Sequence, residues 1–152
     1  MKKVVSILLF YLGGIIALFI LHQRGDLPAW IYRADLAAKA TWTGVMGGVM
    51  YCLRATYLNA CVKKSWDPDW ELWYFLRPLV SGLSGFLSYL FLKAGLIALE
   101  SHKAPDAGAY GFLAFAFLAG MNVDKFISKV ESIFQSLWGI EQSRMTTENR
   151  DK

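Results

Sequence analysis

Charged side chains are scarce in this sequence, and long stretches contain none. They make up 18% of the 152 residues, against 55% hydrophobic residues, which occur in runs rather than alternating with polar ones. Residues 4–21 hold no charge and would form a helix about 27 Å long, close to the roughly 30 Å of a bilayer's hydrocarbon core. A soluble helical bundle would have to hide several such runs in one small core. The scarcity of charge therefore favours an integral membrane protein.

Cysteine and histidine, which most often serve metal centres and thiol chemistry, occur only twice each. Cys52 and Cys61 are nine residues apart on one expected helix and so lie on nearly opposite faces, where they can neither bridge each other nor share a metal. We expect both to be packing residues. His22 and His102 fall in polar connections without further ligands at metal-binding spacing, and no serine lies in a nucleophile elbow or beside a placed base. The sequence thus predicts no catalytic residue, no metal site and no cofactor.

Four apolar segments predict an all-α membrane protein with about four transmembrane helices in a single domain over residues 1–140. The expected spans cover residues 4–22, 37–62, 76–99 and 107–125. The first span follows Lys2 and Lys3 as in a signal peptide, but it is longer than a typical h-region and lacks small residues at cleavage spacing, so we expect an uncleaved anchor. The apolar run 109–121 is too short to cross alone, so the fourth span must also include residues 122–125.

An aromatic segment precedes the third span. Within it, Asp67 can cap a helix that has Pro68 at its first position. Large amphipathic side chains, of the kind that concentrate at the headgroup level, follow on one side: Trp66, Trp70, Trp73 and Tyr74. We expect a short interfacial helix that leads into the third span. The alternative is that these are ordinary core or loop residues.

Residues 126–138 alternate apolar and polar side chains at helical spacing, which predicts an amphipathic C-terminal helix. It could lie on the membrane, continue the fourth span into the cytoplasm, or pair with copies of itself. Residues 141–152 are polar and are expected to form a disordered tail.

Lysine and arginine near the span ends predict the orientation. More of them fall on the side that would hold both termini, so we expect both termini in the cytoplasm of a bacterial inner membrane. The net charge of +4 does not indicate nucleic-acid binding, because the basic residues are spread over the ends of apolar segments.

Small residues recur along one face of three expected spans, where they would let neighbouring backbones approach closely. They are Gly44, Gly47 and Gly48 in the second span, Ser81, Gly85 and Ser88 in the third, and Ala116 and Gly120 in the fourth. We call these faces the small-residue seams. They could serve packing within one chain or contacts between copies.

Three charged residues lie within or at the ends of the spans, where a charge costs about 2.5–3.5 kcal/mol unless it is paired or wetted. Arg54 and Asp124 lie on small-residue seams, so we expect them to point inward and to pair. Arg77 is the competing partner for Asp124. The alternative is that Arg54 snorkels to the headgroups and that Asp124 lies just outside the membrane.

These features favour a non-enzymatic membrane protein that assembles, as a pore, a channel-like effector or a subunit of a membrane complex. The alternative is a small polytopic regulator or immunity-type protein that binds a membrane partner without conducting. A lipid-modifying enzyme would need catalytic groups at the interface, where the sequence offers only His22, Arg24 and Asp26 or His102 and Glu100. The expected partners are the lipid bilayer and either a second copy or another membrane protein, and not nucleic acid.

Overall fold

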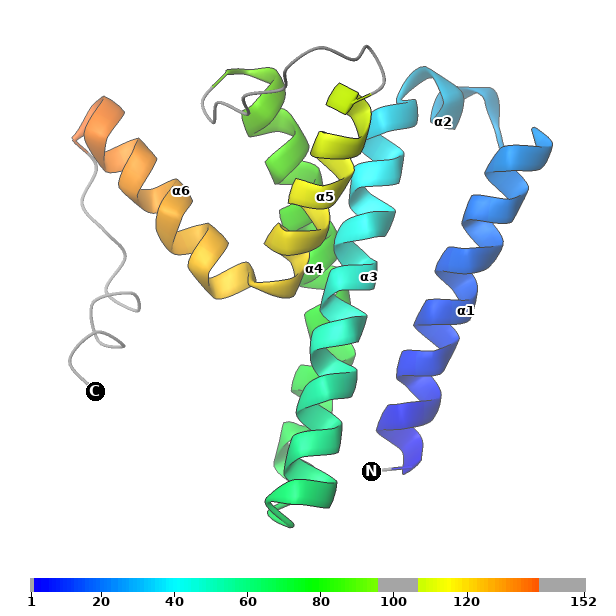
Figure 1. Cartoon of the computed structure of the whole chain (residues 1–152), viewed down its shortest axis with the longest axis vertical. Helices are drawn as coiled ribbons and strands as arrows, with labels where there is room; N and C mark the ends of the chain where they lie inside the picture. The colour runs from blue at the N-terminus through cyan, green and yellow to red at the C-terminus, as the bar shows by residue number, and fades with distance from the viewer. Residues whose placement is uncertain (1, 96–106, 140–152) are drawn as a thin grey trace.

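The structure, a computed structural model, describes residues 2–95 and 107–139, and all the regular elements in them are helical (Figure 1). In chain order they are α1 (Lys2–Arg24), α2 (Ala29–Arg33), α3 (Asp35–Tyr57), the π-helix η1 (Leu58–Val62), the 3-10 helix η2 (Pro68–Trp70), α4 (Glu71–Lys93), α5 (Ala107–Met121) and α6 (Val123–Trp138). The predicted all-helical class is confirmed for these residues.

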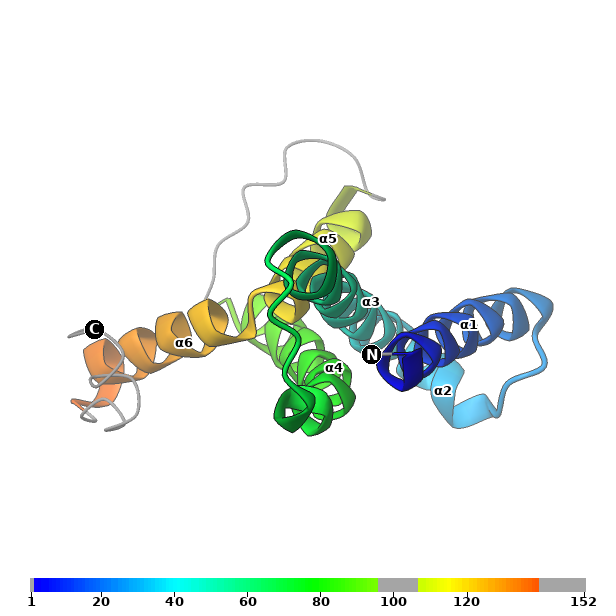
Figure 2. The same ribbon diagram turned by 90° about the horizontal axis from the view of Figure 1, so that it is seen from below.

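Two stretches, Lys2–Arg24 and Pro68–Lys93, are long and apolar enough to cross a membrane, and the bent pair of α5 and α6 makes a third if it is counted as one span. These helices support a transmembrane helical protein. The 23-residue helix α3 does not belong to this group. It lies in the middle of the bundle and contacts α1, α4 and α5 (Figures 1 and 2), so other helices cover it on several sides.

The aromatic segment and the predicted third span form one continuous helical stretch rather than two separate helices. Asp67 caps it, since its carboxylate accepts a hydrogen bond from the Asp69 backbone N–H at 3.0 Å, and α4 then runs through Pro78 without ending. The expected end at residue 99 is too late, because α4 stops at Lys93 and Gly95 adopts a positive φ of 73°. A left-handed glycine of this kind commonly terminates a helix.

The predicted fourth span over residues 107–125 is not one straight helix. Helix α5 ends there, Asn122 leaves the helical conformation with φ −119° and ψ 52°, and α6 starts at Val123 after a bend of 108°. At 1.5 Å per residue, the 15 residues of α5 extend about 22 Å, short of the roughly 30 Å hydrocarbon core. In Figure 1, α5 ends part-way along α3, and α6 runs back toward the end of the bundle at which α5 begins.

Backbone contacts between α3, α4 and α5 form the centre of the bundle. A Cβ atom added to Gly44 would lie 2.6 Å from the Ser81 carbonyl oxygen and 2.8 Å from the Gly85 Cα, and one added to Gly120 would collide with the Gly44 backbone. Gly47 faces α5 in the same way, with the Met121 nitrogen 2.9 Å from its added Cβ. The small-residue seams are therefore filled by other helices of the same chain.

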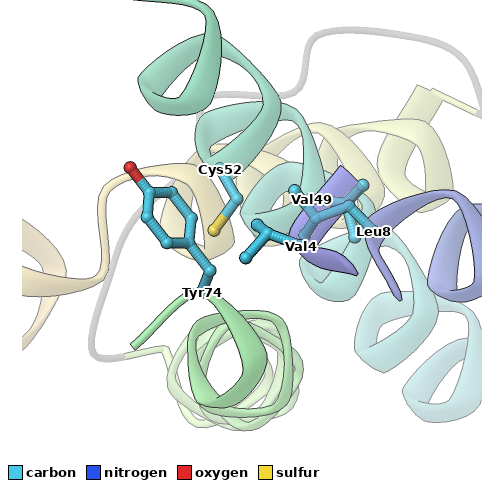
Figure 3. Packing of buried hydrophobic residues seen from close by; sticks show 5 residues of the cluster. All are labelled: Val4, Leu8, Val49, Cys52 and Tyr74. Atoms are coloured by element: carbon cyan, nitrogen blue, oxygen red, sulfur yellow. The ribbon is translucent and has the colours of Figure 1, made fainter. Parts of the chain in front are cut away.

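Helix α1 joins this centre through a small apolar cluster. Val4 and Leu8 of α1 pack with Val49 and Cys52 of α3 and with Tyr74 of α4, as Figure 3 shows. A second cluster joins α6 to the rest, because Phe126 packs against Phe91 of α4 and Ala119 of α5. Each cluster fastens an outer helix to the glycine-rich centre.

Candidate functional site

An ion pair joins α4 to the first turn of α6. The Arg77 guanidinium donates three hydrogen bonds to the Asp124 carboxylate, from Nη1 at 3.1 and 3.3 Å and from Nη2 at 3.1 Å. The two members differ in environment, since the Arg77 side chain is 7% exposed and that of Asp124 is 81% exposed. A bidentate geometry of this kind is among the stronger charge-assisted hydrogen bonds.

Two aromatic rings lie close to the Arg77 guanidinium. Its Cζ lies 5.1 Å from the ring centroid of Tyr51 in α3 and 5.4 Å from that of Trp73, one turn earlier in α4. Both distances fall within the range of cation–π attraction. The buried Nε of Arg77 has no hydrogen-bond partner among the described residues. Aromatic faces and the Asp124 carboxylate thus surround a cation that has little contact with solvent.

Arg54 lies outside this cluster, and the expected pairing of Arg54 with Asp124 is wrong within the chain. Its side chain is exposed, and Asp124 binds Arg77 instead. The reason is the early end of α5, which stops at the level of Gly47. Arg54 is seven residues, or about 10 Å, farther along α3 and so lies beyond the reach of α5.

The aromatic residues before the third span contact one another. The Trp66 and Tyr74 rings stack at 5.5 Å, and Trp73 lies nearly perpendicular to both Tyr74 and Trp70, at 88° and 76°. Tyr74 is buried, whereas Trp70 is 57% exposed. Asn59 of η1 adjoins Tyr74, and its side-chain nitrogen donates a hydrogen bond to the Tyr74 hydroxyl at 3.2 Å.

These rings line a cavity of about 440 Å³ between the end of α3 and the start of α4. The rest of its wall consists of Tyr51, Ala55, Asn59, Ser65 and Asp67. The sequence does not predict this cavity, because the spacing of the tryptophans indicates one helix face and gives no sign that residues of α3 and η1 lie against them. The signals in the sequence that could have indicated a site here are Asp67 directly after Trp66 and Trp70 three residues after Asp67.

A polar cluster lies at the other end of the bundle. The His22 Nε2 is 2.5 Å from Asp35 Oδ1, and the Lys39 Nζ donates a hydrogen bond to Asp35 Oδ2 at 2.8 Å. Burial would raise the pKa of the Asp35 carboxyl, but the hydrogen bond and charge of Lys39, together with His22, hold that pKa below its ordinary value. His22 is only 10% exposed. His22 thus links α1 to α3 through Asp35. The sequence, which places His22 in a polar connection, does not predict this contact.

The two cysteines have different environments. Cys52 is buried in the cluster with Tyr74, as expected of a packing residue. Cys61 is exposed in η1, so the expectation that it packs in the interior is wrong. No group of three metal-ligating side chains occurs within residues 2–95 and 107–139. His102 and Glu100 lie outside the described residues.

Comparison with known proteins gives no relative on which a function could be based. No family model, no curated protein and no solved structure matches the chain.

Proposed function

We propose that this is a small multi-pass protein of a bacterial inner membrane that assembles with copies of itself into a pore or channel-like complex and has no catalytic role. The observation that carries the proposal is the position of α6, an amphipathic helix whose charged face is exposed part-way along a bundle of membrane-spanning length.

The depth of α6 follows from the length of α5. If α5 begins at the membrane surface, its 15 residues end about 8 Å short of the opposite side of the hydrocarbon core. The break at Asn122 and the first turn of α6 are then inside the membrane. Irregular backbone at that depth is tolerated where protein covers it or where it lines a water-filled cavity.

The chemistry of α6 favours water on one side of it. Phe126 faces the bundle and is buried, whereas Asp124, Lys125, Lys129 and Gln135 are exposed. Each charge left in lipid would cost about 2.5–3.5 kcal/mol. Copies of the chain that meet around this face would replace lipid with water and neighbouring protein.

The centre of a single chain leaves no room for a water-filled path between α3, α4 and α5. Helices α3, α4 and α5 touch at Gly44, Gly85 and Gly120, with backbone atoms close enough to exclude even a methyl group. A conducting path would therefore form between copies, along the exposed face of α6, rather than inside one bundle.

For orientation, we propose that Lys2 and the turn at Lys63 and Lys64 face the cytoplasm, in line with the positive-inside rule. The C-terminal tail would also be cytoplasmic if α5 and α6 together crossed the membrane. The return of α6 toward the end at which α5 begins (Figure 1) supports instead a re-entrant pair, with Gly139 on the side opposite Lys2. Labelling of a cysteine at Ser143 by a membrane-impermeant thiol reagent in intact cells would support the re-entrant arrangement. Protection of that cysteine would support two cytoplasmic termini.

The function is tested by measuring the oligomeric state in mild detergent together with ion flux from liposomes. We expect a defined homo-oligomer that conducts, and we expect Lys129→Gln to change the flux or its ion selectivity. Arg54→Gln removes one charge from outside the α6 face and serves as the control. A chain that stays monomeric and silent, and that captures a different membrane protein, would reject self-assembly in favour of a partner-binding regulator.

A further inference from the structure

The cavity between the end of α3 and the start of α4 has no part in the proposed assembly, and its wall resembles a cage for a cation. Five aromatic residues contribute to it: Tyr51, Trp66, Trp70, Trp73 and Tyr74. Its volume of about 440 Å³ lies within the usual size of small-molecule sites, roughly 300–1,000 Å³. We propose that this aromatic cage binds an organic ammonium group, supplied by the headgroup of an aminophospholipid.

The ring geometry supports a cation rather than a flat apolar ligand. Trp73 is nearly perpendicular to Tyr74 and to Trp70, whereas Trp66 stacks on Tyr74 at 20°, so the rings form walls in two directions. Several aromatic walls around one volume form the kind of cage that recognises quaternary ammonium groups. The compact, tetrahedral shape of an alkylammonium suits such walls better than a planar molecule does.

The charges around the cage agree with this ligand. Asp67 contributes a carboxylate to the wall, and Asn59 and Ser65 contribute further polar atoms. Arg77 does not line the cavity, but its guanidinium lies over the rings of Tyr51 and Trp73, and its charge is met by Asp124. The two exposed lysines, Lys63 and Lys64, directly precede Ser65. An aminophospholipid carries a phosphate next to its ammonium group, so the lysines would meet the phosphate while the cage holds the ammonium.

The test uses the full chain in a maltoside detergent, which has no ammonium group, with choline as the probe and tryptophan fluorescence as the readout. The neutral carbon isostere 3,3-dimethylbutan-1-ol has the same shape without the charge. We expect choline to change the fluorescence saturably and the isostere to bind at least about tenfold more weakly. Equal binding of the two compounds, or no saturable response to choline, would overturn the proposal.

Two pairs of substitutions test whether choline binds in the cage. Asp67→Asn removes the carboxylate but keeps a good N-cap residue, so α4 still starts correctly. We expect it to weaken choline binding about three- to tenfold, and we expect Asp69→Asn, which removes an exposed charge outside the cavity wall, to change it less than about twofold. Trp70→Leu should weaken binding about fivefold while Trp70→Phe keeps most of it. Indistinguishable effects of Asp67→Asn and Asp69→Asn would exclude the cage as the binding site.

A last comparison identifies the source of the ammonium group. Choline is titrated against the protein in nanodiscs of phosphatidylglycerol alone and in nanodiscs that also contain phosphatidylethanolamine. If lipid occupies the cage, the apparent affinity for choline falls in the second preparation. An unchanged affinity would overturn the assignment to a lipid headgroup and leave a site for free organic cations. None of these readouts depends on oligomer formation or flux, so the cage and the proposed assembly can fail separately.

Discussion

Two surfaces of this protein are both highly exposed and chemically opposite. Phe10 on α1 is 81% exposed, and the side chain of Asp124 on α6 is largely exposed as well. The α1 surface continues with Leu9 and Ile16, as expected of a helix that faces lipid, whereas the α6 surface continues with Lys125 and Lys129. In a membrane protein, therefore, exposure alone does not identify the surroundings. The chemistry of the exposed side chains separates a lipid-facing surface from one that needs water or another protein.

The glycines extend this comparison. Gly13 and Gly14 of α1 have nothing within 4 Å of an added Cβ, whereas a Cβ on Gly120, just before α6, would overlap the Gly44 backbone. We expect Gly120→Ala to destabilise the protein by at least about 2 kcal/mol through overpacking against a backbone that cannot move aside. Gly13→Ala should be neutral or stabilise α1 by up to about 1 kcal/mol.

Thermal unfolding in detergent measures both variants. If Gly120→Ala and Gly13→Ala shifted the melting temperature alike, the close contact between α3 and α5 would be wrong, and the seams would again be available for contacts between copies.

Removal of Asp124 is expected to cost more than removal of its buried partner. Asp124→Leu leaves the Arg77 charge buried without its counter-ion, for which a loss of about 3–5 kcal/mol is typical. Arg77→Leu leaves an exposed carboxylate that water can solvate, so we expect a smaller loss of about 1–3 kcal/mol. Chemical unfolding of the two variants compares the losses directly.

Arg54→Leu is the control for this pair, because Arg54 is exposed and makes no ion pair with the described residues. Its effect on stability should stay within about 0.5 kcal/mol. A larger loss for Arg54→Leu than for Arg77→Leu would restore the pairing expected from the sequence and reject the one in the structure.

The smallest expected effect concerns the joint between α1 and α3, at the end of the bundle away from the aromatic cage. The pKa of Asp35 is held low by Lys39 and His22, so the ionised carboxylate stabilises the fold. That stabilisation is complete above the ordinary carboxyl pKa of about 4. It is lost as the pH falls through the lower pKa that Asp35 has in the folded protein.

We therefore expect Asp35→Asn to lower the melting temperature at pH 7, and we expect its difference from the unsubstituted protein to shrink as the pH is lowered below about 4. A difference that stayed unchanged however far the pH was lowered would show that the contact between α1 and α3 does not depend on the Asp35 charge.

The sequence predicted the small-residue faces correctly as close-packing surfaces, but it could not say which helices would meet there. Spacing distinguishes Gly44, Gly85 and Gly120, which recur with other small residues, from the adjacent pair Gly13 and Gly14 in a run of large apolar side chains. Whether a neighbour comes from the same chain depends on loop lengths and on the crossing of whole helices, which local spacing does not contain.

The break at Asn122 was missed because a membrane span was assumed to be straight. The apolar run ends at Met121, and extending it through Lys125 required a helix with two charges, Asp124 and Lys125, inside lipid. The chain turns instead, and Val123 and Phe126 are then buried while Asp124 reaches Arg77. The short run followed at once by an amphipathic pattern was the available signal. The contact of Arg77 with Tyr51 could not be predicted from local spacing, because Tyr51 is 26 residues away in the sequence.

The central claim is that the exposed face of α6 meets water within the membrane, whereas that of α1 meets lipid. Cysteines placed at Lys129 and at Phe10, in a Cys61→Ser background with the buried Cys52 retained, test it with a water-soluble maleimide on the membrane-embedded protein. The account predicts that the cysteine at Lys129 reacts and that the one at Phe10, although highly exposed, does not, because a thiol in lipid meets neither water nor the reagent. Equal protection of both positions would contradict it and would place α6 against lipid or inside a dry interface.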